Sequence, residues 1–168
     1  MTEGRAVLQG RKISYTGLFD GKEIYQMIRE KMADKGYDDW IVKKHTEKRG
    51  KNGKQVEIKY LPTSTVNDYT KIQVKIEILY KDLKRTSVKY KGKKIDLDEG
   101  SLEIVFSGFL LTDIWGRWDS SADLFFLRTI MDKFIFWRQT AKYESMVKDH
   151  IEELYNYIRK YLNTTKTD

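Results

Sequence analysis

The sequence predicts an α+β fold in which a curved antiparallel β-sheet of about six strands wraps around a long C-terminal α-helix. Two observations carry this prediction. Several segments alternate apolar and charged residues with a period of two, most regularly residues 71–80. Residues 121–163 instead repeat apolar side chains every three or four positions, without a helix breaker. Strands with one apolar face need a cover, and this helix is the longest apolar one available.

The first elements are a strand over residues 11–19 and a short helix over residues 21–35. Asp20 with Glu23 three positions later resembles a capping box, and Gly36 is a natural C-terminal cap. The side chains expected on the buried face of this helix are Ile24, Met27, Ile28 and Met32.

The remaining strands are expected at residues 37–49, 54–61, 71–80 and 101–111. Residues 86–97 predict a further strand or a short hairpin around Gly92. Alternation places Tyr60, Tyr80 and Tyr90 on the apolar face of the sheet.

An unbroken helix over residues 121–163 would be about 60 Å long, whereas a domain of this size is only about 40 Å across. We therefore expect the helix either to bend near residues 138–143 or to project. Its inward face in the second half comprises Val147, Ile151, Leu154, Ile158 and Tyr161. A projecting end would expose this stripe and favour a homodimer.

Length and composition indicate one soluble domain. The chain has 168 residues, which we divide into a loose N-terminus (1–10), a domain (11–163) and a loose C-terminus (164–168). Cysteine is absent, and neither a targeting segment nor a membrane span is visible, so we expect a cytoplasmic protein. Residues 1–100 hold 23 basic and 15 acidic side chains, so the excess positive charge lies there.

The order strand, helix, antiparallel meander and long terminal helix resembles the helix-grip fold of the START-like (SRPBCC-type) superfamily, which includes birch-pollen-allergen-like carriers. The resemblance covers roughly residues 12–162 and lies in topology and pattern. It implies an apolar ligand held in a cavity between the curved sheet and the terminal helix.

Catalytic chemistry has little support in the sequence. His45 and His150 lack metal-ligating companions at helical spacing, so we expect no metal site and no cofactor. Nucleophile elbows and phosphate-binding loops are absent from the sequence. We therefore lean towards a protein that is not an enzyme.

The first hypothesis is a binding module that holds an apolar or lipid-like small molecule in this cavity. Arg117, in an aromatic setting, could hold a polar head group at its mouth, or close the sheet-to-helix connection. The candidate cavity residues are Tyr15, Tyr60, Ile76, Phe106, Trp115, Arg117, Phe126, Ile130, Phe134 and Trp137.

Two alternatives remain open. A Lys-rich outer sheet face could bind RNA or another anionic partner through its phosphates, or the domain could lack a cavity and dimerise through its terminal helix. The candidate residues for an anionic partner are Lys43, Lys44, Lys48, Arg49, Lys51, Lys59, Lys71 and Lys75.

Overall fold

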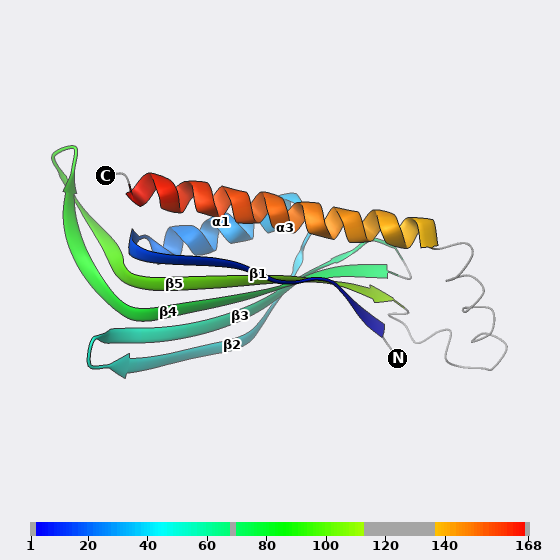
Figure 1. Cartoon of the computed structure of the whole chain (residues 1–168), viewed down its shortest axis with the longest axis horizontal. Helices are drawn as coiled ribbons and strands as arrows, with labels where there is room; N and C mark the ends of the chain where they lie inside the picture. The colour runs from blue at the N-terminus through cyan, green and yellow to red at the C-terminus, as the bar shows by residue number, and fades with distance from the viewer. Residues whose placement is uncertain (1–2, 68–69, 113–136, 167–168) are drawn as a thin grey trace.

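The computed structural model describes residues 3–67, 70–112 and 137–166. Its elements in chain order are β1 (Glu3–Phe19), α1 (Gly21–Asp34), β2 (Asp39–Gly50), β3 (Gly53–Thr65), β4 (Thr70–Tyr90), β5 (Lys93–Thr112) and α3 (Trp137–Lys166). The strands form one antiparallel sheet in the order β1-β5-β4-β3-β2. Both helices lie on the same face, and the far end of β4 and β5 curls towards that face (Figure 1).

The α+β class and the antiparallel sheet with a C-terminal helix are confirmed, and this topology is compatible with the helix grip. Among the described residues the sheet has five strands, against the expected six or so. Of the two alternatives for residues 86–97, the hairpin around Gly92 is present. It is formed by the ends of β4 and β5, because β4 continues through Asp82 to Tyr90 and turns at Gly92 into β5. A bulge at Asp82, which has φ +54°, bends β4 without ending it.

The concave face carries the core, as alternation predicted. Every second residue of β4 from Ile72 to Tyr80 is buried, and so are the inward residues of β5 that pair with them. The fully covered positions in these two strands include Val74, Ile76, Leu102, Ile104 and Phe106, each 0% exposed. Burying large apolar side chains at this density supplies most of the free energy that holds the sheet to its helices.

Helix α1 begins and ends where the sequence places its caps. The Asp20 carboxylate accepts hydrogen bonds from the backbone N–H groups of Lys22 and Glu23, and Gly36 follows the helix with φ +87°. The four apolar residues expected to be inward are the four buried residues of this helix. The hydroxyl of Tyr161 on α3 accepts a hydrogen bond from the backbone N–H of Asp20 at 3.2 Å, so the two helices meet at this cap.

Helix α3 is continuous from Trp137 to Lys166, so of the two alternatives left open, a break near residues 138–143 does not occur. Its stripe at Val147, Ile151, Leu154 and Ile158 packs against the sheet of its own chain. Tyr161 is only half-buried, and Leu162 takes the next buried position instead. The stripe expected to mediate dimerisation is therefore covered within the chain.

Regular secondary structure extends into both end segments of the chain. Residues 3–8, expected to be loose, form the start of β1 and pair with β5, because the apolar end of β5 offers them a partner. The helix also continues past residue 163 to Lys166. No described helix is both long and apolar enough to cross a membrane.

Two ion pairs and one glycine set the position of α3. Arg5 pairs with Glu144 at 3.1 Å, and Arg11 pairs with Glu152 at 2.9 Å, which ties the helix to β1 along its length. A Cβ atom on Gly108 of β5 would lie 2.5 Å from Val147 Cγ1. The helix can approach β5 this closely only because position 108 has no side chain.

Candidate ligand-binding groove

The described part of the concave face has two notable hollows, which lie on different sides of the filled core. The first, here called the edge cleft, lies between β1 and the last turns of α3 and has a volume of about 280 Å³. The second, here called the tyrosine groove, lies between the start of α1 and strands β3 and β4 and has a volume of about 350 Å³.

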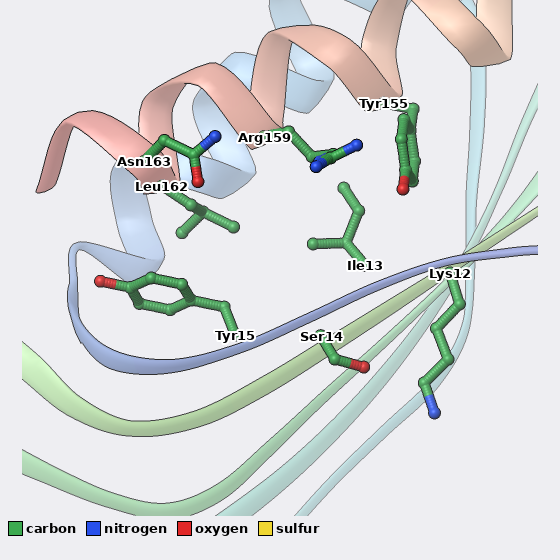
Figure 2. A pocket seen from close by; sticks show the side chains of 8 residues that line it. All are labelled: Lys12, Ile13, Ser14, Tyr15, Tyr155, Arg159, Leu162 and Asn163. Carbon is green, nitrogen blue, oxygen red and sulfur yellow. The ribbon is translucent and has the colours of Figure 1, made fainter. Parts of the chain in front are cut away.

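The edge cleft is largely polar. Figure 2 shows Arg159 extending across it towards Tyr155, while the Tyr15 ring lies beneath Leu162. The Tyr155 ring has the guanidinium groups of Arg11 and Arg159 at 3.9 and 5.5 Å from its centroid. Its eight lining residues are Lys12, Ile13, Ser14, Tyr15, Tyr155, Arg159, Leu162 and Asn163. These walls offer little continuous apolar surface for a lipid-like molecule.

The tyrosine groove has mainly apolar and aromatic walls. Its lining residues are Gly21, Lys22, Tyr25, Lys54, Val56, Ile58, Tyr60, Ile78, Tyr80, Leu83, Arg85 and Asp98. The volume falls within the roughly 300–1,000 Å³ of typical ligand sites, and such sites combine apolar walls with a few polar groups.

Aromatic stacking holds the walls of the tyrosine groove in place. Tyr25 of α1 lies 5.4 Å from Tyr60 of β3 between ring centroids, and Trp40 of β2 lies 5.2 Å from Tyr60. Tyr80 stacks on the buried ring of Phe19 at 5.8 Å. Because these rings contact one another, α1 rests on large side chains here and leaves space beneath its first turn.

The polar groups of the tyrosine groove are also fixed. Asp98 of β5 accepts one hydrogen bond from the backbone N–H of Gly21 at 3.0 Å and another from Arg85 at 3.1 Å. Burial raises the pKa of Tyr60 to about 12 and raises the pKa of Tyr80 as well. Both hydroxyl groups therefore stay protonated at neutral pH and can donate hydrogen bonds to a ligand.

The predicted cavity residues do not converge on one hollow. Tyr15 lines the edge cleft, Tyr60 lines the tyrosine groove, and Ile76 and Phe106 are fully buried in the core. The helix α3 begins at Trp137, whose side chain is outside the described residues. Five further candidates also lie outside them, namely Trp115, Arg117, Phe126, Ile130 and Phe134.

The structure adds groove residues that the sequence did not single out. Tyr25 sits next to the buried stripe of α1, so its position on an intermediate helix face was a usable signal. Leu83 and Arg85 were not predictable, because the bulge at Asp82 changes which residues of β4 face inward. The same shift puts Tyr90 on the opposite face from Tyr80, which corrects the expectation from simple alternation. Asp98 keeps the alternation of β5 that places Leu102 inward, so that spacing was a usable signal.

The basic residues proposed for an anionic partner are spread over three strands and a turn. Lys44 pairs with Glu57 at 2.8 Å, Lys59 pairs with Glu77 at 3.0 Å, and Lys75 lies 3.9 Å from the same Glu77. These pairs alternate positive and negative charge across the outer face. Arg49 lies opposite Lys54 in the β2–β3 ladder and so shares the groove side of the sheet. Lys43, Lys48, Lys51 and Lys71 complete the set.

Catalytic groups are not assembled in either hollow. Among the described residues, no cluster of three His, Asp or Glu side chains could hold a metal ion. The hydroxyl of Tyr37 lies 3.0 Å from His150 Nδ1, but Tyr37 is buried and lines neither hollow. A scan against protein-family models, a search of curated proteins and a search of solved structures found no match to the chain.

Proposed function

We propose that the protein is a non-enzymatic binding module that holds an apolar or lipid-like small molecule in the tyrosine groove. The observation that carries the proposal is a hollow of about 350 Å³ on the concave face, bounded by apolar strand residues and tyrosine rings. A hollow of this size would exclude water from a ligand and add apolar contacts on several sides. An antiparallel sheet with a C-terminal helix, which is compatible with the helix grip, supports the same class of function by analogy with START-like carriers.

The groove also limits the chemistry of its ligand. Val56, Ile58 and Ile78 form an apolar floor. Lys22, Lys54 and Arg85 stand at the rim, where Lys54 is already paired with Glu47 and Arg85 with Asp98. A ligand with an apolar or aromatic body and one polar or acidic group fits this arrangement best.

A thermal-shift screen with fatty acids and sterols, together with native mass spectrometry of protein purified from cells, tests the proposal. A ligand at about 100 times its Kd stabilises a protein by about 2.7 kcal/mol, which corresponds to a rise in Tm of roughly 5–10 °C for a chain of this size. We expect a shift of this order with at least one amphiphile.

A pair of variants assigns the binding to the groove. Ile58→Trp fills the groove floor from a half-buried position, and Leu79→Trp adds the same bulk at a half-buried position on the opposite face of the sheet. The first variant should abolish the ligand-induced shift and the second should retain it. Protein that is ligand-free by mass and does not respond to any amphiphile would contradict the proposal, as would equal loss in both variants.

A further inference from the structure

The ends of β4 and β5 form a two-stranded ribbon that extends beyond the rest of the sheet. The last β4 residue paired with β3 is Leu83, and the first β5 residue paired with β1 is Asp98. Residues 84–97, here called the arm, therefore pair with neither β3 nor β1. Residues 86–90 pair with residues 93–97, and Lys84 and Arg85 pair with Glu99 and Asp98 at the base of the arm. Figure 1 shows the arm rising at the end of the sheet opposite the N-terminus. An isolated ribbon of this kind gains little stability from packing.

The arm concentrates the positive charge of the protein. It holds six of the 32 basic residues and a single acidic residue, Asp96, so it contributes +5 to a net charge of +7. Arg85 pairs with Asp98 at the base. The other five are Lys84, Lys89, Lys91, Lys93 and Lys94, and no described acidic side chain lies within ion-pair distance of them. The outer sheet face differs, since glutamates pair with its lysines.

The turn of the arm keeps a lysine where the backbone disfavours it. Lys91 and Gly92 have φ +49° and +78°, as the two central residues of a type I′ turn do. Asn or Gly would adopt the first of these positions with less strain. Lysine at position 91 thus adds charge at the extreme tip despite a local conformational penalty.

One face of the arm is apolar and open to solvent. The bulge at Asp82 places Val88, Tyr90 and Ile95 on the face opposite the tyrosine groove. Val88 pairs directly with Ile95, and Tyr90 pairs with Lys93. Tyr90 is 42% exposed and Ile95 is 37% exposed, so these side chains form an apolar strip beside the lysines of the tip.

We propose that the arm docks the protein on the surface of an anionic lipid bilayer. Lysines near such a surface are attracted by acidic head groups, and a ribbon with apolar side chains on one face can bury them at the head-group boundary, as amphipathic helices do. Tyrosine also favours this boundary. Nucleic acid fits less well, because it would leave Val88 and Ile95 unused, and Lys91 already lies 5.3 Å from the Tyr90 ring centroid.

The location of the arm relates docking to the proposed groove without depending on it. Arg85 lies in the arm and Leu83 directly precedes it, and both line the tyrosine groove. Docking by the arm therefore brings that groove close to the bilayer. The ligand-blocking variant Ile58→Trp should bind vesicles as the wild type does, so failure of one proposal can be told from failure of the other.

Vesicle sedimentation tests the contribution of charge. Vesicles of phosphatidylcholine with about 30% phosphatidylserine are compared with pure phosphatidylcholine, at about 0.1 M salt. We expect binding to the anionic vesicles only. The triple variant Lys91→Gln, Lys93→Gln and Lys94→Gln should weaken it roughly a hundredfold. The matched control, Lys43→Gln, Lys48→Gln and Lys51→Gln, removes the same charge from exposed positions outside the arm and should weaken binding less than about threefold.

A second pair of variants tests the apolar strip. Tyr90→Ser with Ile95→Ser removes its two most exposed large side chains, and Ile41→Ser with Val42→Ser removes two exposed apolar side chains of β2. Because salt screens the lysines but not the apolar strip, the wild type should keep part of its vesicle binding at high salt. The arm variant should lose this remaining binding, and the β2 variant should retain it. All four positions are at least one-third exposed, so thermal melts are expected to show folded protein.

Three results would overturn the proposal. The first is absence of binding to anionic vesicles, and the second is equal weakening by the two lysine variants. The third is tighter binding to single-stranded or duplex RNA than to the vesicles, with loss in the arm variant, which would assign the arm to nucleic acid instead.

Discussion

The two halves of the concave face are covered by helices in different ways. At Val147 and Ile151 of α3, Gly108 lets the helix backbone approach until both side chains meet β5, and the space there is filled. Under the start of α1, Tyr25 and Tyr60 meet ring to ring, and the tyrosine groove remains beside them. The size of the residues at the contact sets the separation of the layers. The small residue therefore gives a filled core at Val147 and Ile151, and the large rings leave a hollow beside Tyr25.

The largest expected effect comes from comparing one apolar deletion in each half. Phe106→Ala removes a fully buried ring from the filled half and should lower the free energy of unfolding by about 3–5 kcal/mol. Ile58→Ala, at a half-buried position on the groove floor, should cost less than about 2 kcal/mol, because no closed cavity is created. Urea denaturation of both variants measures the difference. Equal losses would show that the groove is packed as tightly as the core.

A smaller effect tests the close approach of α3. Gly108→Ala places a methyl group 2.5 Å from Val147 Cγ1 and 2.9 Å from Ile151 Cδ1, so the helix must shift. We expect a loss of about 1–3 kcal/mol, seen as a lower urea midpoint. The double variant Gly108→Ala with Val147→Ala should lose less than the sum of the two single changes, because it removes the closer of the two collisions. Full additivity would contradict this account of the contact.

The smallest effect concerns the contact between His150 of α3 and Tyr37, which lies in the segment before β2. Burial, and secondarily Lys35, lowers the pKa of His150 below its ordinary value. Between the folded and unfolded pKa values the unfolded chain binds more protons, so stability rises with pH there. This contribution is complete above about pH 6.5 and is lost as the pH falls towards the folded value.

Urea midpoints measured from pH 7.5 down to pH 5 test the contribution of His150 to stability. The wild type should lose stability over that window, and His150→Asn should flatten the change. The control His45→Asn alters an exposed position on β2 and should keep the wild-type slope. A slope that survives in His150→Asn would assign it to other groups.

Much of the fold was predictable, because the spacing of apolar and polar residues along an element indicates which side chains are buried. The four inward residues of α1, the alternation of β4 from Ile72 to Tyr80, and the stripe of α3 from Val147 to Ile158 were all expected from spacing. The bulge at Asp82 was not, since neither Asp nor its neighbours carry a bulge signal. It reversed the face of Tyr90 and brought Leu83 and Arg85 to the groove.

The site was less predictable than the fold, because a hollow forms where the side chains of two packed layers do not contact each other. Tyr15 and Tyr60 were grouped in one cavity from their apolar faces, yet they line different hollows. Pattern identifies the face that a side chain occupies but not the distance to the layer above it. That distance follows from residue sizes in two elements at once, as the contrast between Gly108 and Tyr25 illustrates.

Strand β2 forms one border of the sheet, with one side of its backbone unmatched by any described strand. Such a border invites a second molecule to add its own strand and begin an aggregate. Lys43, Lys44, Lys48 and Arg49 lie along it, and a register shift between Val42 and Lys44 distorts it. Repulsion between like charges and the irregular backbone of β2 both disfavour the addition of such a strand. These cations thus have a use in keeping the protein dispersed at high concentration, whatever else they contact.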